Sequence, residues 1–154
     1  RENAEGIYVD SIDSPQILKI SEPIGLRLPL FIGASNRAIL AFLSPELRRS
    51  LMDSFDWENM PSLKPLTKAF IEQEIEQIRR QGYAISSGEA TEGTTGIGAP
   101  IFSYDNMVIG SLNVAGPSIR FGEQDVEKYS RLAIKYANMI STELGYRGRY
   151  RLQT

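Results

Sequence analysis

The sequence of 154 residues contains 17 Lys and Arg against 19 Asp and Glu, which gives a net charge of -2, and it has neither cysteine nor histidine. This length suits one domain spanning 1–154. The charge argues against nucleic-acid binding by this chain, because phosphate contacts need a basic surface. Without cysteine there is no thiol catalysis, and without histidine the commonest metal ligand and general base are missing. We therefore expect no catalytic residue, metal or cofactor. A reducing cytoplasm is compatible with this composition, and no apolar run is long enough to cross a membrane.

The first elements expected along the chain are extended. Residues 6–12 (GIYVDSI) and 16–22 (QILKISE) read as two strands joined by Asp13-Ser14-Pro15. A third extended stretch runs from Gly25 to Pro29. The two ends of the chain, 1–5 and 147–154, are expected to be flexible.

Helical signals follow. A helix is expected from about Ser35, with Ser35 or Asn36 as its cap, and Ser44-Pro45 starts a second, short helix. Residues 53–66 contain two prolines and no clear period, so they read as a loop. The next helix should span 67–81, where isoleucines recur at helical spacing and Gly82 provides a left-handed stop.

The second half of the sequence predicts a sheet and a long helix. A strand at 83–86 precedes a hairpin of strands 96–104 and 107–115, and a helix at 123–144 ends at Gly145. Strands grouped as hairpins, with helices between the groups, are typical of an α+β fold with a mainly antiparallel sheet. We expect helices on one side of this sheet and a pocket roofed by loops on the other.

The hairpin has two contrasting faces if Asp105-Asn106 is a two-residue loop. That loop would place Tyr104 opposite Met107 and Gly96 opposite Ala115. One face then carries apolar side chains, namely Ile97, Ala99, Ile101, Val108, Leu112 and Val114. The other, which we call the small face, carries Gly96, Gly98, Pro100, Ser111, Asn113 and Ala115. A small face leaves room for a ligand, but glycine in a strand also marks close packing of a helix, and the pattern alone favours packing.

No constellation for catalysis stands out. There is no Gly-x-Ser-x-Gly motif, and the glycines at 93, 96 and 98 lack the Gly-Lys-Ser/Thr ending of a phosphate-binding loop. Glu89 and Glu92 read as solvated loop carboxylates. Thr94 and Thr95 lie where this loop meets the hairpin. The run 33–35 (GAS) opens a helix with small residues, where backbone N–H groups can bind an anion, although capping by Ser35 explains it equally.

Four segments in order resemble the effector-binding domain of IclR-type bacterial transcriptional regulators. They are GLRLPLFIGASNRAILAFL at 25–43, IRRQGYAISSGEATEGTTGIGAPIF at 78–102, VIGSLNVAGPSIRF at 108–121 and ANMISTELGY at 137–146. The resemblance implies a GAF-like α+β domain that binds a small metabolite and forms dimers or dimers of dimers. It also implies that DNA is bound only through an N-terminal winged helix-turn-helix domain, which is absent from this sequence.

The resemblance also implies where a ligand binds. The family's effector pocket corresponds to Gly33, Ala34, Ser35, Ser86, Thr94, Gly96, Asn113 and Ala115, and the small face adds Gly98 and Ser111. No Lys or Arg lies within these pocket motifs, so we expect a carboxylate-bearing metabolite held by backbone N–H groups and hydroxyls. The chain departs from the family pattern at several positions, so no relative's effector transfers. They are Phe31, where histidine is common, Asn36-Arg37, where Gly-Lys is common, Ser86, where some relatives have aspartate, and Ala115, often a serine.

Two other functions remain open on the sequence. A hydrolase or isomerase would use Ser86, Thr94 or Glu89, but it would lack histidine, cysteine or a nearby lysine. A GAF-like dimerisation module without a ligand would fill its pocket with aromatic side chains such as Phe31 or Tyr83.

Overall fold

The computed structural model describes residues 2–148. Its elements are β1 (Glu5–Ile7), β2 (Arg27–Pro29), α1 (Ala34–Leu40), α2 (Pro45–Ser54), α3 (Lys68–Gln81), β3 (Ala84–Ser87), β4 (Thr94–Phe102), β5 (Val108–Pro117), η1 (Ser118–Arg120) and α4 (Glu123–Glu143). Residue 1 and residues 149–154, part of the expected flexible ends, lie outside the described range. Within that range Glu2 and Glu5 exchange backbone hydrogen bonds of 2.9 and 3.0 Å, so a closed turn precedes β1. None of the helices in the described range is long and apolar enough to span a membrane.

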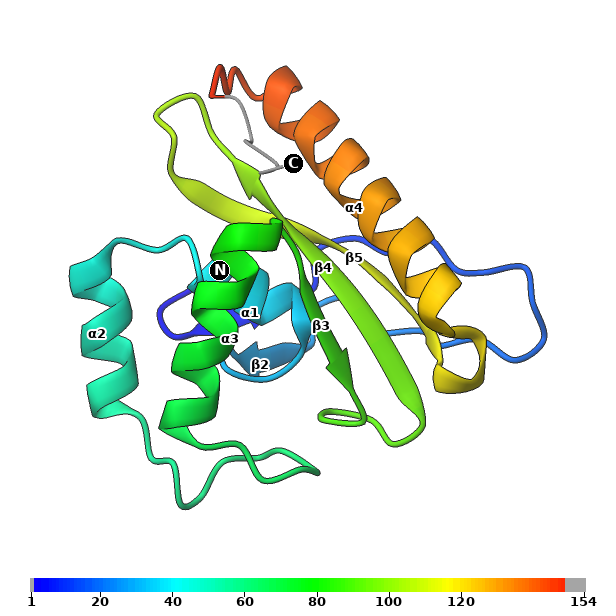
Figure 1. Cartoon of the computed structure of the whole chain (residues 1–154), viewed down its shortest axis with the longest axis horizontal. Helices are drawn as coiled ribbons and strands as arrows, with labels where there is room; N and C mark the ends of the chain where they lie inside the picture. The colour runs from blue at the N-terminus through cyan, green and yellow to red at the C-terminus, as the bar shows by residue number, and fades with distance from the viewer. Residues whose placement is uncertain (1, 149–154) are drawn as a thin grey trace.

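The fold is α+β and its strands pair antiparallel, as expected. β3, β4 and β5 form one sheet, and β1 and β2 form a separate pair. Helices cover both faces of the three-stranded sheet, with α1 and α3 on one side and α4 on the other (Figure 1). The expectation of helices on one side only is therefore wrong. Both faces of the hairpin carry side chains that are buried in the fold, and a different helix covers each face.

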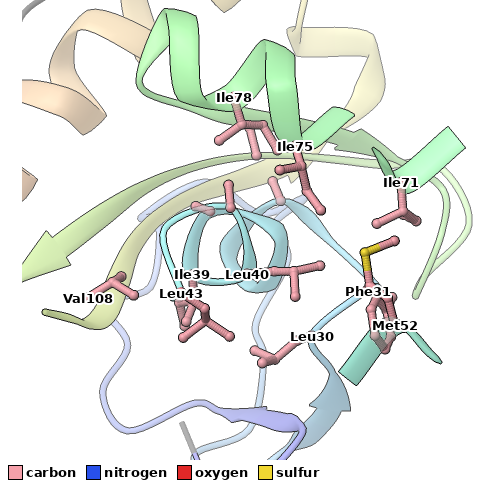
Figure 2. Close-up of a cluster of buried hydrophobic side chains, with 14 of the residues drawn as sticks. Leu30, Phe31, Ile39, Leu40, Leu43, Met52, Ile71, Ile75, Ile78 and Val108 are labelled. Carbon is pink, nitrogen blue, oxygen red and sulfur yellow. The ribbon is translucent and has the colours of Figure 1, made fainter. Parts of the chain in front are cut away.

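Two hydrophobic cores result, one on each face. Ile97 and Ala99 of β4 pack against Ala133 and Ala137 of α4. The larger core lies on the α1 side, where α1 packs with α3 and with the chain leading into it (Figure 2). Ile71, Ile75 and Ile78 of α3 are almost fully buried there, as their spacing predicted.

The starts of α2 and α3 follow local capping signals, and the start of α1 does not. Ser44 accepts a hydrogen bond from the Leu47 N–H at 3.3 Å, and Thr67 accepts from the Phe70 N–H at 3.2 Å. Gly82 has φ +83° and ends α3 in the left-handed conformation. The cap of α1 is Gly33, with no side-chain hydrogen bond, so the expected capping by Ser35 or Asn36 is wrong.

The predicted hairpin register is correct along most of the hairpin. Pairs from Gly96 opposite Ala115 to Pro100 opposite Ser111 are observed, but a bulge between Ile101 and Phe102 pairs Phe102 with Val108. The two-residue loop is wrong: a turn over 103–106, in which the Asn106 N–H donates to the Ser103 carbonyl at 3.0 Å, sits inside a longer connection. Asn106 takes φ +62°, and the bulge turns Val108 onto the α1 side of the sheet, into the larger core.

The expected strand pair 6–12 and 16–22 is also wrong. Only 5–7 form a strand, and this strand pairs with 27–29 instead. Ile12 and Ile17 are 97% and 104% exposed, so the apolar alternation in this segment has no layer to pack against. Asp13 instead closes a local loop by accepting hydrogen bonds from Lys19 and Ser21.

Candidate ligand site

The start of α1 lies directly on the middle of the small face. A Cβ placed on Gly98 would meet the Ala34 carbonyl oxygen at 2.6 Å and the Ser35 nitrogen at 2.7 Å, so only glycine fits there. Ser111 reinforces the contact by donating its hydroxyl hydrogen to the Ser35 carbonyl at 2.8 Å. Pro100, next along β4, is fully buried. The packing interpretation of the small face therefore applies to Gly98.

One end of the small face stays open beyond α1. We call it the open end, and it consists of Ser86, Gly96, Asn113 and Ala115. A Cβ placed on Gly96 would lie 3.3 Å from Asn113 Oδ1 and 3.6 Å from Ser86 Oγ, so two polar groups converge above this glycine. Ser86, Gly96 and Asn113 are half-buried and Ala115 is exposed, so this end is accessible from the surface.

Tyr8 adds a polar group that the sequence did not single out. Its hydroxyl lies 3.4 Å from Ser35 Oγ. Burial raises the pKa of the Tyr8 phenol, the hydrogen bond with Ser35 lowers it, and the charge of Glu22 raises it. The sequence placed Tyr8 in a hairpin with 16–22, and only the observed pairing of β1 with β2 brings it beside α1.

The backbone donors at the start of α1 are engaged by the chain itself. The Ala34 N–H donates to Ser86 Oγ at 2.8 Å, and the Gly33 N–H donates to Glu89 Oε2 at 2.9 Å. Glu89 is only 6% exposed, so its interpretation as a solvated carboxylate is wrong. Gly33, Ala34 and Ser86 are thus brought together as predicted, but through hydrogen bonds within the chain.

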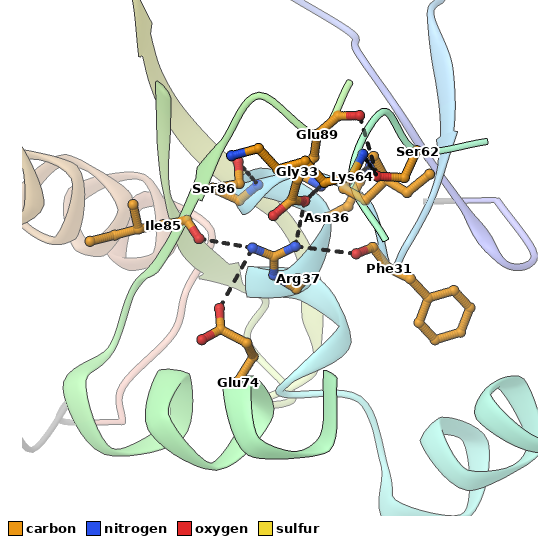
Figure 3. Close-up of polar contacts among 12 residues, drawn as sticks. Phe31, Gly33, Asn36, Arg37, Ser62, Lys64, Glu74, Ile85, Ser86 and Glu89 are labelled. Carbon is orange, nitrogen blue, oxygen red and sulfur yellow. Dashed lines mark hydrogen bonds and ion pairs between the residues drawn. The ribbon is translucent and has the colours of Figure 1, made fainter. Parts of the chain in front are cut away.

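Glu89 is buried because Arg37 pairs with it (Figure 3). Arg37 Nη1 donates to Glu89 Oε2 at 2.5 Å and to the Phe31 carbonyl at 3.3 Å, while Nη2 donates to the Ile85 carbonyl at 2.8 Å. Glu74 of α3 lies 3.6 Å from Nη2. Arg37 lies one helical turn after the Gly33–Ser35 motif. In the sequence, the only sign of this buried polar cluster is an arginine within an otherwise apolar helix.

Thr94 lies two residues before Gly96 on β4, but its hydroxyl is already used within the chain. Its hydroxyl donates to the Thr91 carbonyl at 2.6 Å and so stabilises the loop before β4. Thr95 points to the opposite face, where it lies in a chain of hydroxyls between Ser87 and Ser118. Both threonines therefore lie at the start of the first hairpin strand, as the sequence indicated, but their hydroxyls stabilise local structure.

The chemistry of the open end is that of binding. Hydroxyls and one amide are present, and the Glu89 carboxylate is held by Arg37 and so is not free to act as a base. No group of acidic side chains within residues 2–148 could hold a metal ion. A cleft elsewhere is lined by Lys64, Ser87, Glu92 and Ser118, among others, but it contains no unpartnered buried polar atom among the described residues. Asn113 Oδ1, at the open end, is such an atom.

Comparison with known proteins identifies the family of this chain. The family model for the bacterial transcriptional regulator IclR C-terminal domain matches residues 1–142. The chain belongs to this IclR family. It is 32% identical over 146 residues to the HTH-type transcriptional regulator KipR of Bacillus subtilis, which covers 95% of this chain and 58% of KipR. It is 26% identical over 140 residues to the regulator KdgR of Escherichia coli, covering 91% of this chain and 53% of KdgR.

Solved structures of the IclR family share the fold. The crystal structure of Thermotoga maritima IclR superposes with a TM-score of 0.85 at 26% identity, over 95% of this chain and 59% of that one. The C-terminal domain of E. coli KdgR gives a TM-score of 0.73 at 26% identity, over 93% of this chain and 87% of that one. This chain spans little more than half the length of the full regulators it matches. It is a regulatory domain of a family of transcriptional regulators, whose members bind small-molecule effectors and form oligomers, and the enzyme alternative is not favoured.

Proposed function

We propose that this IclR-family domain binds a small carboxylate-bearing metabolite at its open end and self-associates. We further propose that ligand binding changes how the full-length regulator binds DNA in the cytoplasm. The proposal rests on the convergence of Asn113 Oδ1 and Ser86 Oγ above Gly96, next to the start of α1, whose Ala34 N–H donates to Ser86. The donors for a carboxylate are then neutral side chains, because both terminal nitrogens of the Arg37 guanidinium are bound to Glu89, Phe31 and Ile85. Neutral donors favour moderate affinity.

The packing of the aromatic side chains supports a ligand over a dimerisation module without one. Phe31, an expected pocket filler, is fully buried against Phe55 and Trp57, with ring centroids 4.4 and 4.9 Å away. Tyr83 packs with the α4-side core instead. Neither ring belongs to the polar group at the open end, which therefore keeps its hydrogen-bonding groups for a ligand.

Replacing Asn113 with Leu tests this proposal. Leucine fills the open end and removes its amide while leaving the α4 side of the hairpin intact. In calorimetric titration with small carboxylic acids, the variant should lose binding that the wild type shows. Asn59→Leu, an exposed amide in the loop before α3, is the matched control. Equal binding by a folded Asn113→Leu variant would place the site elsewhere.

DNA binding gives a second test. The chain by itself should not bind DNA specifically, since its net charge is -2. In the full-length protein, the ligand should change operator affinity, and operator DNA should change ligand affinity by the same factor. Specific retardation of operator DNA by this domain alone would contradict the assignment of DNA binding to the upstream domain.

A further inference from the structure

One buried acceptor of the open end lacks a partner. Among the described residues only Asn113 Oδ1 and Arg37 Nε are buried polar side-chain atoms without a hydrogen bond. Arg37 Nε belongs to a guanidinium whose other two nitrogens are bound by the chain itself. Asn113 Oδ1 instead faces the position that a side chain on Gly96 would occupy. An unpaired buried acceptor is costly, so a group that donates to it would be bound favourably.

A spare donor lies beside this acceptor. Ser86 Oγ accepts the hydrogen bond of the Ala34 N–H at 2.8 Å, and its own hydroxyl hydrogen has no acceptor among the described residues. A serine hydroxyl carries one hydrogen and two lone pairs, so this hydrogen is free to be donated. The point above Gly96 is 3.3 Å from Asn113 Oδ1 and 3.6 Å from Ser86 Oγ. Both polar atoms therefore border the space that a side chain at Gly96 would fill.

We propose that the ligand of this site presents a hydroxyl group to the space above Gly96. The hydroxyl donates to Asn113 Oδ1 and accepts from Ser86 Oγ. A carboxylate can only accept and an ammonium can only donate, whereas a hydroxyl does both with one atom. This inference rests on the proposed function and narrows its ligand class to hydroxy acids, whose carboxylate is held by the remaining hydroxyls and amide of the site.

Pairs of probes that differ by one hydroxyl test the proposal. Lactate is compared with propionate, and 3-hydroxybutyrate with butyrate, by titration calorimetry and thermal shift of the protein. The hydroxylated member of at least one pair should bind about 5- to 100-fold more tightly, because its partner leaves a buried acceptor unpaired. Equal binding within both pairs would overturn the inference.

Gly96→Ala removes the space without removing either polar group. Its methyl group occupies the point above Gly96, and the backbone at Gly96 does not require the left-handed conformation, so the variant should fold. The hydroxyl preference should vanish in this variant, and binding of propionate and butyrate should change little. Gly110→Ala on β5 is the matched control, since its added Cβ meets nothing within 4 Å.

The outcomes separate this inference from the proposed function. If the acids bind, Asn113→Leu abolishes binding, but the hydroxyl and Gly96→Ala make no difference, the proposed site stands and only the hydroxyl is wrong. If Asn113→Leu leaves binding unchanged, or if no hydroxylated probe binds at millimolar concentration, both fail. A hydroxyl preference that survives Gly96→Ala would place the hydroxyl at another position and overturn the inference.

Discussion

Arg37 Nη1 and Glu89 Oε2 lie 2.5 Å apart, in side chains only 1% and 6% exposed. This pair joins parts of the chain that are distant in sequence. Glu89 also accepts from the Gly33 N–H at the start of α1, and its backbone carbonyl accepts from the Leu63 N–H at 2.7 Å. The start of α1, the β3–β4 connection and the loop before α3 are thereby held together next to the open end.

Removing one member of this pair should destabilise the domain strongly. Glu89→Leu leaves the Arg37 charge buried without its nearest partner, and we expect a loss of about 3–5 kcal/mol in the free energy of unfolding. Replacing both residues together, Arg37→Met with Glu89→Leu, should cost less, because the only carboxylate that loses its cation is then Glu74, whose side chain is 22% exposed. Urea denaturation measures both. Glu92→Leu, in the same loop but exposed, is the control, and a loss below about 1 kcal/mol for Glu89→Leu would contradict the role of the pair.

Gly98 should tolerate no side chain. Gly98→Ala would press a methyl group against the α1 backbone, at 2.6 Å from the Ala34 carbonyl oxygen, where no flexible side chain can yield. Overpacking of this kind costs about 1–3 kcal/mol. Thermal denaturation should show a clearly lowered melting temperature for Gly98→Ala and almost none for Gly110→Ala, whose Cβ lies in open space. Equal melting temperatures would mean that α1 does not rest on β4 as described.

Tyr8 should make stability depend on pH in the alkaline range. Folding raises the pKa of Tyr8, chiefly through burial, so the unfolded chain releases this proton first as the pH rises past about 10. The contribution of Tyr8 is therefore complete below that pH and is lost as the pH rises through the folded-state pKa. Between pH 9 and pH 11, the free energy of unfolding measured by urea denaturation should fall more for the wild type than for Tyr8→Phe. Tyr104→Phe, at a residue 77% exposed, should behave like wild type.

Self-association should use the C-terminal half of α4. Tyr136 and Met139 are 47% and 53% exposed, so this helix presents apolar surface beyond the side chains that face the sheet. Met139→Glu should shift the protein toward monomer in sedimentation velocity, whereas Lys128→Glu, exposed near the start of the same helix, should not. A monomeric wild type at high concentration would exclude this surface as an interface. Tyr129 of the same helix is half-buried against Phe121 and does not add to this surface.

Several elements could be predicted from sequence because their signals are local. The isoleucine spacing in α3, its Thr67 cap and its Gly82 stop depend on neighbours within a few positions. The register around Gly98 and Asn113 follows from strand alternation, which repeats every two residues. The bulge that places Val108 on the α1 side was not predicted, because the turn residues allow more than one loop length. The loop length decides how the residues next to it pair.

The amino-acid sequence by itself determined the α+β class, the ends of α3 and the small face, and it suggested residues that could line a site. Only the tertiary structure decided which small residues serve packing and which remain open. Gly98 and Gly96 are indistinguishable by local pattern, yet α1 lies on the first and stops short of the second. Glu89 and Tyr8 likewise acquired their surroundings from segments 52 and 27 residues away, Arg37 and Ser35. Burial and long-range hydrogen bonds depend on how whole elements meet in space, which local sequence patterns do not encode.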